Sequence, residues 1–201
     1  MKKYLFAFAM FSALASTAMA EGVYVALDVG QSKAKDMCSA ANFGVNPAVG
    51  ISSCSDTATA YRIGGGYQFS RYFGAEVSYA DLGNVNPVSG PGGFTQSTKA
   101  KTLQGAAIGY LPLPAGFSIF GKLGLARTKF DQSWNGPPPG NASASNTNLA
   151  YGIGAQFDFL RNFAVRAQYE DFGNVGTSPV TATTTGKSKV TLMSAGLVFR
   201  F

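Results

Sequence analysis

The sequence VTLMSAGLVFRF, residues Val190 to Phe201, decides how this chain folds. Its larger apolar residues fall on every second position and alternate mostly with small or polar ones, which is the pattern of a β-strand with two different faces. The apolar face runs to the final residue, whereas the end of a soluble domain is usually polar and frayed. The stretch therefore predicts a strand that faces lipid, provided that the rest of the chain completes a closed barrel. The apolar face consists of Met193, Ala195, Leu197, Phe199 and Phe201.

The first twenty residues have the pattern of a secretory signal peptide. Lys2 and Lys3 form a basic start, an apolar run extends from Tyr4 to Leu14, and Ala18 to Ala20 provide a small-residue cleavage site. A membrane helix is the alternative, but the run is short and no stop-transfer pattern follows. We expect residues 1–20 to be removed and residues 21–201 to form one barrel domain.

The same alternation recurs along the mature chain. In the fourth predicted strand, Leu103 and Ile108 have opposite parity, which means that strict alternation places them on opposite faces of the strand. We expect a β-bulge to bring both onto the apolar face. The pattern predicts an all-β fold, an eight-stranded antiparallel up-and-down transmembrane β-barrel. The strands are expected near residues 23–31, 59–69, 73–79, 102–111, 117–125, 149–159, 163–170 and 190–201.

The predicted faces differ in a way that favours a membrane barrel. The continuous face is apolar, whereas the other face carries glycine, serine, glutamine and charged residues, which is the reverse of a soluble sandwich. Aromatic and charged residues each make up 13% of the chain, an unusual balance for a soluble domain. Tyr79 and Tyr169 are expected to form one aromatic girdle. The other girdle is expected from Tyr67, Phe69, Phe73, Phe117, Phe159, Phe163, Phe199 and Phe201.

The connections alternate between short and long. Short turns are expected at Ser70-Arg71, Pro112 to Ala115 and Leu160-Arg161. Outer-membrane barrels have short periplasmic turns and long extracellular loops, so both termini are predicted to be periplasmic. Long loops are expected near residues 32–58, 81–101, 128–148 and 171–188.

One internal repeat supports this arrangement. The segment 71–85, with Asp81-Leu82-Gly83-Asn84, recurs 90 residues later as 161–175, with Asp171-Phe172-Gly173-Asn174. Duplication of a hairpin pair explains the repeat, and so does the use of the same turn chemistry twice.

The composition limits the chemistry that this chain can perform. It contains no histidine, so neither a Ser-His nor an Asp-His catalytic pair is available, and no metal site, cofactor or enzymatic activity is predicted. The net charge of +6 is scattered, which argues against nucleic acid as a partner. Cys38 and Cys54, the only cysteines, are expected to form a disulfide in an exported chain.

The chain resembles the small eight-stranded outer-membrane barrels of the OmpA transmembrane-domain type, from Glu21 to Phe201. The resemblance implies a bacterial outer-membrane location, contact with outer-membrane lipid and lipopolysaccharide, and insertion by the barrel-assembly machinery, which would read Phe199 and Phe201. The chain departs from this type in showing no periplasmic peptidoglycan-binding domain, so no cell-wall tether is expected. The resemblance rests on the segments Tyr24 to Gly30, Gly65 to Gln68, Gly74 to Val77 with Tyr79 and Leu82-Gly83, Lys122 to Gly124, and Phe199 to Phe201.

The resemblance also implies a lumen closed by charged pairs. Asp28 stands where a lysine is commoner in such barrels, and Gln156 stands where a glutamate is commoner. The pairing of the lumen charges must therefore be worked out from this chain. Buried charges need partners, and we expect Glu76 and Arg166 to meet across the lumen. Separately solvated charges are the alternative. The predicted lumen network comprises Asp28, Arg62, Glu76, Lys122, Gln156, Arg166 and Gln168.

Two functions remain open at this point. The first is a non-enzymatic structural or surface-interaction barrel that uses its loops, with Phe94, Trp134 and the prolines 137–139 as candidates to contact an unknown surface ligand. The second is a small passive pore or a conduit for apolar ligands.

Overall fold

The computed structural model describes residues 22–35, 55–84, 88–89, 95–135, 139–177 and 186–201. The predicted signal peptide, both cysteines of the expected disulfide and Phe94 lie outside these residues.

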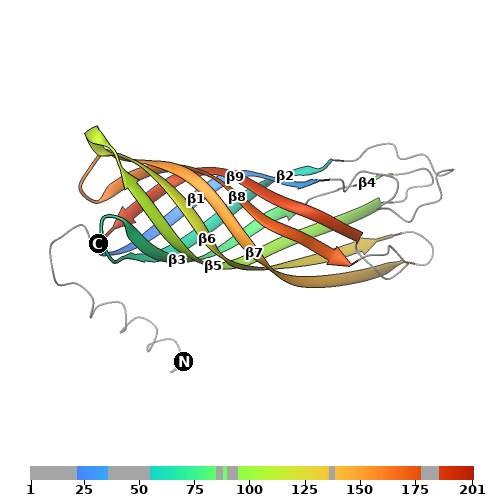
Figure 1. Ribbon diagram of the computed structural model, residues 1–201. Helices are drawn as coiled ribbons and strands as arrows, with labels where there is room; N and C mark the ends of the chain where they lie inside the picture. Colours follow the sequence, from blue (N-terminus) through green and yellow to red (C-terminus); the bar gives the residue numbers. More distant parts are fainter. Residues whose placement is uncertain (1–21, 36–54, 85–87, 90–94, 136–138, 178–185) are drawn as a thin grey trace, which may run out of the picture.

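The described strands form a closed antiparallel barrel, as the sequence predicts. The sheet order is β3-β2-β1-β9-β8-β7-β6-β5-β4, and a further pairing of β3 with β5 closes it (Figure 1). Eight strands form the wall, and the two-residue β4 (Val88–Ser89) adds to β5. The wall strands are β1 (Gly22–Lys35), β2 (Thr57–Gln68), β3 (Phe73–Asn84), β5 (Thr95–Pro112), β6 (Phe117–Trp134), β7 (Gly140–Asp158), β8 (Phe163–Thr177) and β9 (Gly186–Arg200).

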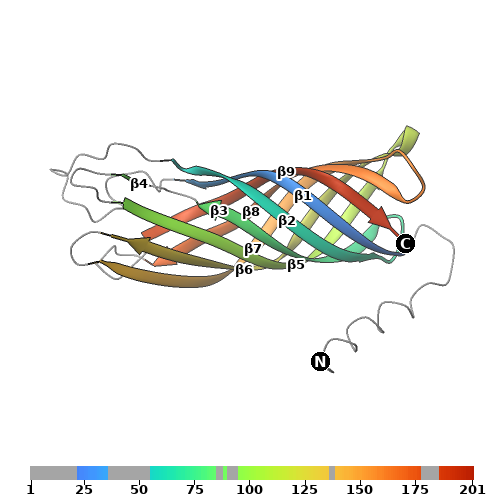
Figure 2. The same cartoon turned by 180° about the vertical axis from the view of Figure 1, so that it is seen from behind.

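The terminal stretch that predicted the barrel joins the sheet to its beginning. β9 pairs with β1 in a register that places Leu197 opposite Leu27, and the Phe201 amide donates to the Val23 carbonyl at 3.1 Å. The C-terminus lies at the same end as the short β2–β3, β5–β6 and β7–β8 connections, whereas β4 lies at the opposite end (Figures 1 and 2). A short 3-10 helix, η3 (Pro114–Gly116), makes the β5–β6 turn.

The outer face is apolar around the whole circumference. Leu27, Ile63, Leu123 and Ile153 are each more than half exposed, which water would disfavour and lipid favours. Near the short turns the aromatic rings touch one another: Phe163 and Phe199 are 4.9 Å apart between ring centroids. Other contacts of this girdle join Tyr67 to Phe69, Phe117 to Phe157, Phe159 to Phe163, and Phe199 to Phe201. Among the described residues, no helix is long and apolar enough to cross a membrane.

The expected bulge in the fourth wall strand is absent. β5 pairs with β6 without interruption from Gln96 to Pro112, and its register with β3 holds from Gly109 to Lys101. Leu103 faces outward and is 54% exposed, whereas Ile108 faces the lumen and is buried. The parity conflict arose because Ile108 was assigned to the lipid side, although apolar residues also line part of the lumen.

The strands extend far into the segments expected to be loops. β6 continues to Trp134 and β7 begins at Gly140, so most of residues 128–148 form a hairpin. β5 likewise begins at Thr95, and β8 continues to Thr177. The barrel therefore continues as a regular sheet beyond its apolar outer belt.

The 90-residue repeat builds the same irregularity twice. The Asp81 carboxylate accepts the Gly83 amide at 3.0 Å, and the Asp171 carboxylate accepts the Gly173 amide at 2.9 Å. Both glycines have φ of 75°, a left-handed conformation that favours glycine, and both sites shift the register of the next pairing. Leu82 and Phe172, which precede the two glycines, continue the inward alternation of their strands and are fully buried.

Candidate functional site

A layer of charged side chains fills the middle of the lumen. Asp28 and Arg62 are neighbours on β1 and β2, and Glu76 follows on β3. Lys122 comes from β6, and Arg166 comes from β8 on the wall opposite β3. All five are at least 95% buried, because alternation turns them inward and the barrel closes around them.

Glu76 is the centre of the layer. Lys122 Nζ and Arg166 Nη1 each donate to its carboxylate at 2.8 Å, and Arg62 makes a third ion pair. The Tyr24 hydroxyl donates to the same carboxylate at 2.9 Å. Glu76 and Arg166 thus contact each other across the lumen, and the alternative of separately solvated charges does not describe this geometry.

Asp28 forms the second acidic centre. Its carboxylate accepts from Arg62 at 2.6 Å and from Arg166 at 3.3 Å, so both guanidinium groups bridge Asp28 and Glu76. Gln168 Nε2 lies 3.5 Å from the same oxygen and also donates to Ser194 Oγ at 3.3 Å. Bridging guanidinium groups give a branched network rather than isolated pairs.

The sequence reasoning left one member out of this network. Glu170 is fully buried, and its carboxylate lies 3.3 Å from Arg62 Nε and 3.5 Å from Lys122 Nζ. It has the same strand parity as Arg166 and Gln168, so the signal was present. Its oxygens make ion pairs but no hydrogen bond within the described residues.

Gln156 does not reach the charged layer. Its amide donates to Asp158 at 3.1 Å, near the short-turn end, where Asp158 also pairs with Arg200 at 3.0 Å. Gln156, Asp158 and Arg200 thus form a small polar group at the short-turn end of the barrel.

An aromatic layer lies on the short-turn side of the charges. The Tyr110 and Phe120 rings are 5.9 Å apart, and Lys122 Nζ and the Arg166 guanidinium lie 5.6 and 5.8 Å from the Phe120 centroid. Gly66 and Gly154 make room for this layer, since a Cβ on either would collide with the Tyr24 or Phe120 ring. The rings therefore cover one side of the charged layer and make cation–π contacts with it.

An apolar cluster lies on the other side of the charges, toward the long strand ends. Leu82 and Phe172, one beside each bulge, pack there with Phe130 from β6. The charged layer is thus enclosed between two layers of buried apolar and aromatic side chains. The remaining members of the cluster are Ala34, Ala60, Ala80, Ala100, Ala126, Ala150, Val175, Val190 and Leu192.

The layer is electrically balanced. Within the described residues it contains three carboxylates (Asp28, Glu76 and Glu170) and three bases (Arg62, Lys122 and Arg166), each with an opposite charge within 3.5 Å. Such an arrangement can hold the barrel walls together and fill the lumen. The described residues contain no group of three or more His, Cys, Asp or Glu side chains placed to hold a metal ion.

The sequence model of one protein family, the outer membrane protein beta-barrel domain, matches residues 4–201 of the chain. The chain belongs to this family. Proteins of the family reside in the bacterial outer membrane, and the lipid-facing belt places this protein there as well. No curated protein matches the sequence significantly.

Solved structures share the fold at low sequence identity. Neisserial surface protein A is 17% identical, with a TM-score of 0.59 over 91% of this chain and 100% of that one. Ail of Yersinia pestis is 18% identical, with a TM-score of 0.51 over 89% and 99%. OprG of Pseudomonas aeruginosa is 14% identical, with a TM-score of 0.54 over 90% and 96%. At these identities the likeness concerns the fold alone.

Proposed function

We propose that this protein is a non-enzymatic barrel that acts at the cell surface and whose lumen is closed by a plug of its own side chains. The observation that carries the proposal is the balanced charged layer enclosed between the aromatic and the apolar layers. An ion crossing the barrel would have to displace buried ion pairs and two layers of packed rings and aliphatic side chains.

The working surface is then the extracellular end, where the strands extend beyond the lipid-facing belt. Trp134 ends β6 at this end, although its side chain lies outside the described residues, and Pro139 is exposed just before β7. The proposed partners of this extracellular end are outer-leaflet lipid, including lipopolysaccharide, and a surface ligand not yet identified. The Ail structure was solved in complex with the heparin analogue sucrose octasulfate. An anionic sugar is therefore a reasonable class of ligand to test first.

Conductance in a planar lipid bilayer tests the plug. We expect the refolded barrel to show no stable open steps, and Glu76→Ala to introduce them by removing the centre of the layer. The matched control is Gln156→Ala, which removes an inward polar side chain outside the network. Stable steps from the unmodified protein that change in size with Glu76→Ala would instead establish the alternative, a small passive pore.

A second part of the proposal concerns assembly. We propose that Phe199 and Phe201, exposed on the outer face of the last strand, are read by the barrel-assembly machinery. Deleting Phe201 should lower the amount of folded barrel in the outer membrane, detected by the heat-dependent shift in gel mobility. Substituting Phe159, an exposed ring of the same girdle, is the control. Equal losses for both changes would mean that the girdle as a whole is needed rather than the terminal strand.

A further inference from the structure

The outer face of the barrel changes from apolar to polar at one level around the whole circumference. On every wall strand, an exposed apolar or tyrosine side chain is followed two residues further out by a polar one, as Leu125 is by Arg127 on β6. This step marks the outer boundary of the membrane. The last members of the belt are Val29, Tyr61, Tyr79, Leu103, Leu125, Leu149, Tyr169 and Met193, and the first polar ones are Gln31, Thr59, Asp81, Lys101, Arg127, Thr147, Asp171 and Thr191.

Beyond this boundary, the two copies of the 90-residue repeat differ in the length of one strand. Asn148 on β7 corresponds to Ala58 on β2, and a Cβ built on the bulge glycine of either copy would lie 3.0 or 3.1 Å from the matching side chain. β2 begins at Thr57, whereas β7 begins at Gly140. β7 therefore carries an outward extension that its counterpart lacks.

The extension is paired on one side only within the part of the chain that the structure describes. β7 pairs with β6 as far out as Gly140, but with β8 only as far as Tyr151. Where the second pairing stops, the Asn148 amide donates to two carbonyls of β8 at 2.8 and 3.3 Å. The β6–β7 hairpin then runs on past the end of β8 (Figures 1 and 2). Gly140 to Ser145 thus form a sheet edge with no described strand beside it.

This edge has none of the features that usually prevent an edge strand from pairing with another chain. Between Gly140 and Ser145 there is no charged residue and no proline, and the register with β6 shows no bulge. The outward side chains of Asn141, Ser143 and Ser145 are small, polar and exposed. An extended peptide could therefore add to the edge as a further strand.

Basic side chains of the neighbouring strand lie close to the edge on the outer face. Arg127 Nε donates to Ser145 Oγ at 3.1 Å, so the guanidinium group lies over β7. Lys129 is the register partner of Ser145 on the same face, and its side chain is 57% exposed. At the usual strand spacing an added strand would lie about 10 Å from β6, within reach of these long side chains.

The outer face here carries an excess of positive charge. Lys101 on β5 is directly opposite Lys129, and Lys99 is opposite Asp131. Asp131, which pairs with Lys129 at 2.9 Å, is the one carboxylate that the described parts of β5, β6 and β7 place on this face beyond the boundary. Acidic side chains on an added strand would therefore be attracted to this face.

Charge also distinguishes between the two kinds of strand that could add to this edge. A second copy of β7 would bring its own Arg127 and Lys129 to the same place, and like charges on neighbouring strands destabilise a sheet. An acidic peptide would instead form charge-assisted hydrogen bonds with these bases. The charges thus favour an acidic peptide over a second barrel.

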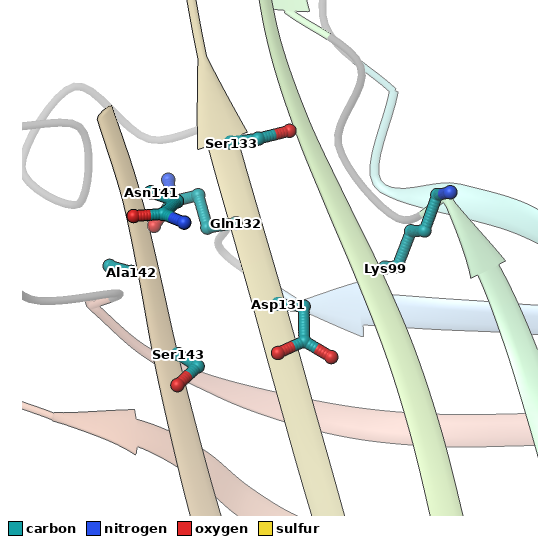
Figure 3. A pocket seen from close by; sticks show the side chains of 7 residues that line it. All are labelled: Lys99, Asp131, Gln132, Ser133, Asn141, Ala142 and Ser143. Carbon is teal, nitrogen blue, oxygen red and sulfur yellow. The ribbon is translucent and has the colours of Figure 1, made fainter. Parts of the chain in front are cut away.

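A polar groove of about 420 Å³ lies on the outer face beside the edge. Figure 3 shows its side chains on three adjacent strands, with Asn141 and Ser143 on the edge strand itself. Because alternate side chains of a strand point to the same face, every second side chain of an added strand would lie next to this groove. The lining consists of Lys99, Asp131, Gln132, Ser133, Asn141, Ala142 and Ser143.

We propose that Gly140 to Ser145 bind an acidic, extended segment of a partner polypeptide as an additional strand. The backbone of the segment pairs with the outer edge of β7, and its acidic side chains lie toward Arg127 and Lys129. The proposal deepens the proposed function by naming the chemistry of the surface ligand, and it rests on that function in placing this end of the barrel outside the cell.

Binding of a fluorescent peptide to the detergent-solubilised barrel tests the pairing of the backbone. The probe is a peptide of about ten residues that alternates threonine and glutamate. Two further versions carry N-methyl groups on all threonine amides or on all glutamate amides, and each loses the donors of one edge. We expect one version to lose binding and the other to retain it. Equal binding by both, or loss by both, would overturn strand addition.

Charge variants of the barrel test the chemistry of the partner. We expect R127Q/K129Q to bind the threonine–glutamate peptide about tenfold more weakly, whereas K33Q/K35Q, which removes two exposed charges on β1, changes affinity less than about twofold. Equal losses in both variants, or equal affinity for a threonine–glutamine peptide, would overturn the preference for acidic segments. The heat-dependent gel shift verifies that each variant is folded.

Amide hydrogen exchange locates the bound peptide. Exchange of alternate amides between Asn141 and Ser145 should slow when the peptide binds, while amides of β2 near Thr57 should not change. Protection of the β7 amides without peptide, in a barrel that is dimeric in micelles, would assign the edge to a second copy instead. A sulfated sugar that displaces the peptide, together with no effect of N-methylation, would assign the surface to anionic sugars.

The outcome is separable from that of the plug. R127Q/K129Q should remain silent in the planar bilayer, and Glu76→Ala should retain peptide binding. A conducting barrel that still distinguishes the two methylated peptides would refute the plug and support the edge, whereas a silent barrel that binds no peptide would refute the edge alone.

Discussion

The two sections of this barrel, one within the lipid-facing belt and one beyond it, have opposite polarity on the same strands. On β6, Lys122 faces the lumen while Leu123 faces outward and is 56% exposed. A few residues further, Phe130 is fully buried in the lumen, and Lys129 faces outward with its side chain 57% exposed. The alternation keeps its phase along the strand, and only the chemistry of the two faces is exchanged.

The difference shows that the surroundings of the barrel decide what its interior contains. Where lipid lies outside, the middle of the lumen is filled by charges that neutralise one another, beside a layer of aromatic rings. Where water lies outside, the lumen is an ordinary apolar core, built by burying Leu82, Phe130 and Phe172. The outer section is thus organised like a small soluble barrel attached to a membrane barrel.

The largest effect is expected from breaking the charged interior. Glu76→Ala leaves Arg62, Lys122 and Arg166 facing one another, and we expect it to lower the free energy of unfolding by about 3–5 kcal/mol. Denaturant unfolding in micelles measures the change. Gln156→Ala, inward but outside the network, should cost far less. Similar losses for both would mean that filling the lumen matters more than neutralising its charges.

The next effect is expected from the apolar interior of the outer section. Leu82→Ala removes a fully buried side chain, and we expect a loss of about 2–4 kcal/mol in the same unfolding measurement. Lys101→Ala, on the outside of the same section, should change stability by no more than about 0.5 kcal/mol. A Leu82→Ala protein as stable as the unmodified barrel would show that the outer section has no core of its own.

A charge placed on the outer face should distinguish the two sections directly. Leu123→Lys introduces a charge into lipid and should cost about 2 kcal/mol, whereas Ser133→Lys on the same face of the same strand should be close to neutral. Unfolding from lipid bilayers rather than micelles gives the clearest reading. Equal costs would place the membrane boundary elsewhere than between Leu125 and Arg127.

The smallest effect concerns the boundary itself. Burial raises the pKa of Asp171, but hydrogen bonds from Lys189, the Gly173 amide and the Tyr151 hydroxyl outweigh it and hold this pKa below its usual value. The stabilisation is therefore present above a pH of about 4 and is lost as pH falls through the lowered pKa. The Asp171 side chain is buried, but that of its partner Lys189 is 43% exposed, so the pair is partly screened and Asp171→Asn should cost about 1 kcal/mol at pH 7.

Unfolding at pH 7 and at pH 3 measures this contribution. The difference between Asp171→Asn and the unmodified protein should shrink at the lower pH. A difference that stays constant would mean that Asp171 acts through the geometry of its bulge alone.

The fold and its lipid face could be predicted because period-two alternation is strong where large apolar side chains occupy one face. The same signal fails beyond the membrane. In Asn141 to Ser145 the alternating residues are small and polar, so the sequence resembles a loop although the segment is strand. Ile108 was misplaced because an apolar inward residue at the short-turn end has the same chemistry as a lipid-facing one.

The members of the charged layer were predictable from parity, but their partners were not. Parity shows that Glu170 points inward, whereas only the register between β7 and β8 and between β8 and β9 shows its height in the barrel. Two inward residues contact each other across the lumen only if they lie at the same height. Gln156 was grouped with the charged layer because it points inward; it is the register partner of Arg166, but its amide donates to Asp158 instead.

The charged layer has a consequence for the order in which the barrel can close. Strands β1 to β3 contribute Asp28, Arg62 and Glu76, with one negative charge in excess, while β6 and β8 contribute Lys122, Arg166 and Glu170, with one positive charge in excess. Neither half of the sheet can neutralise its own interior. An open sheet therefore has two mutually attracting halves, and joining β9 to β1 balances the last charges at the moment when the wall becomes continuous.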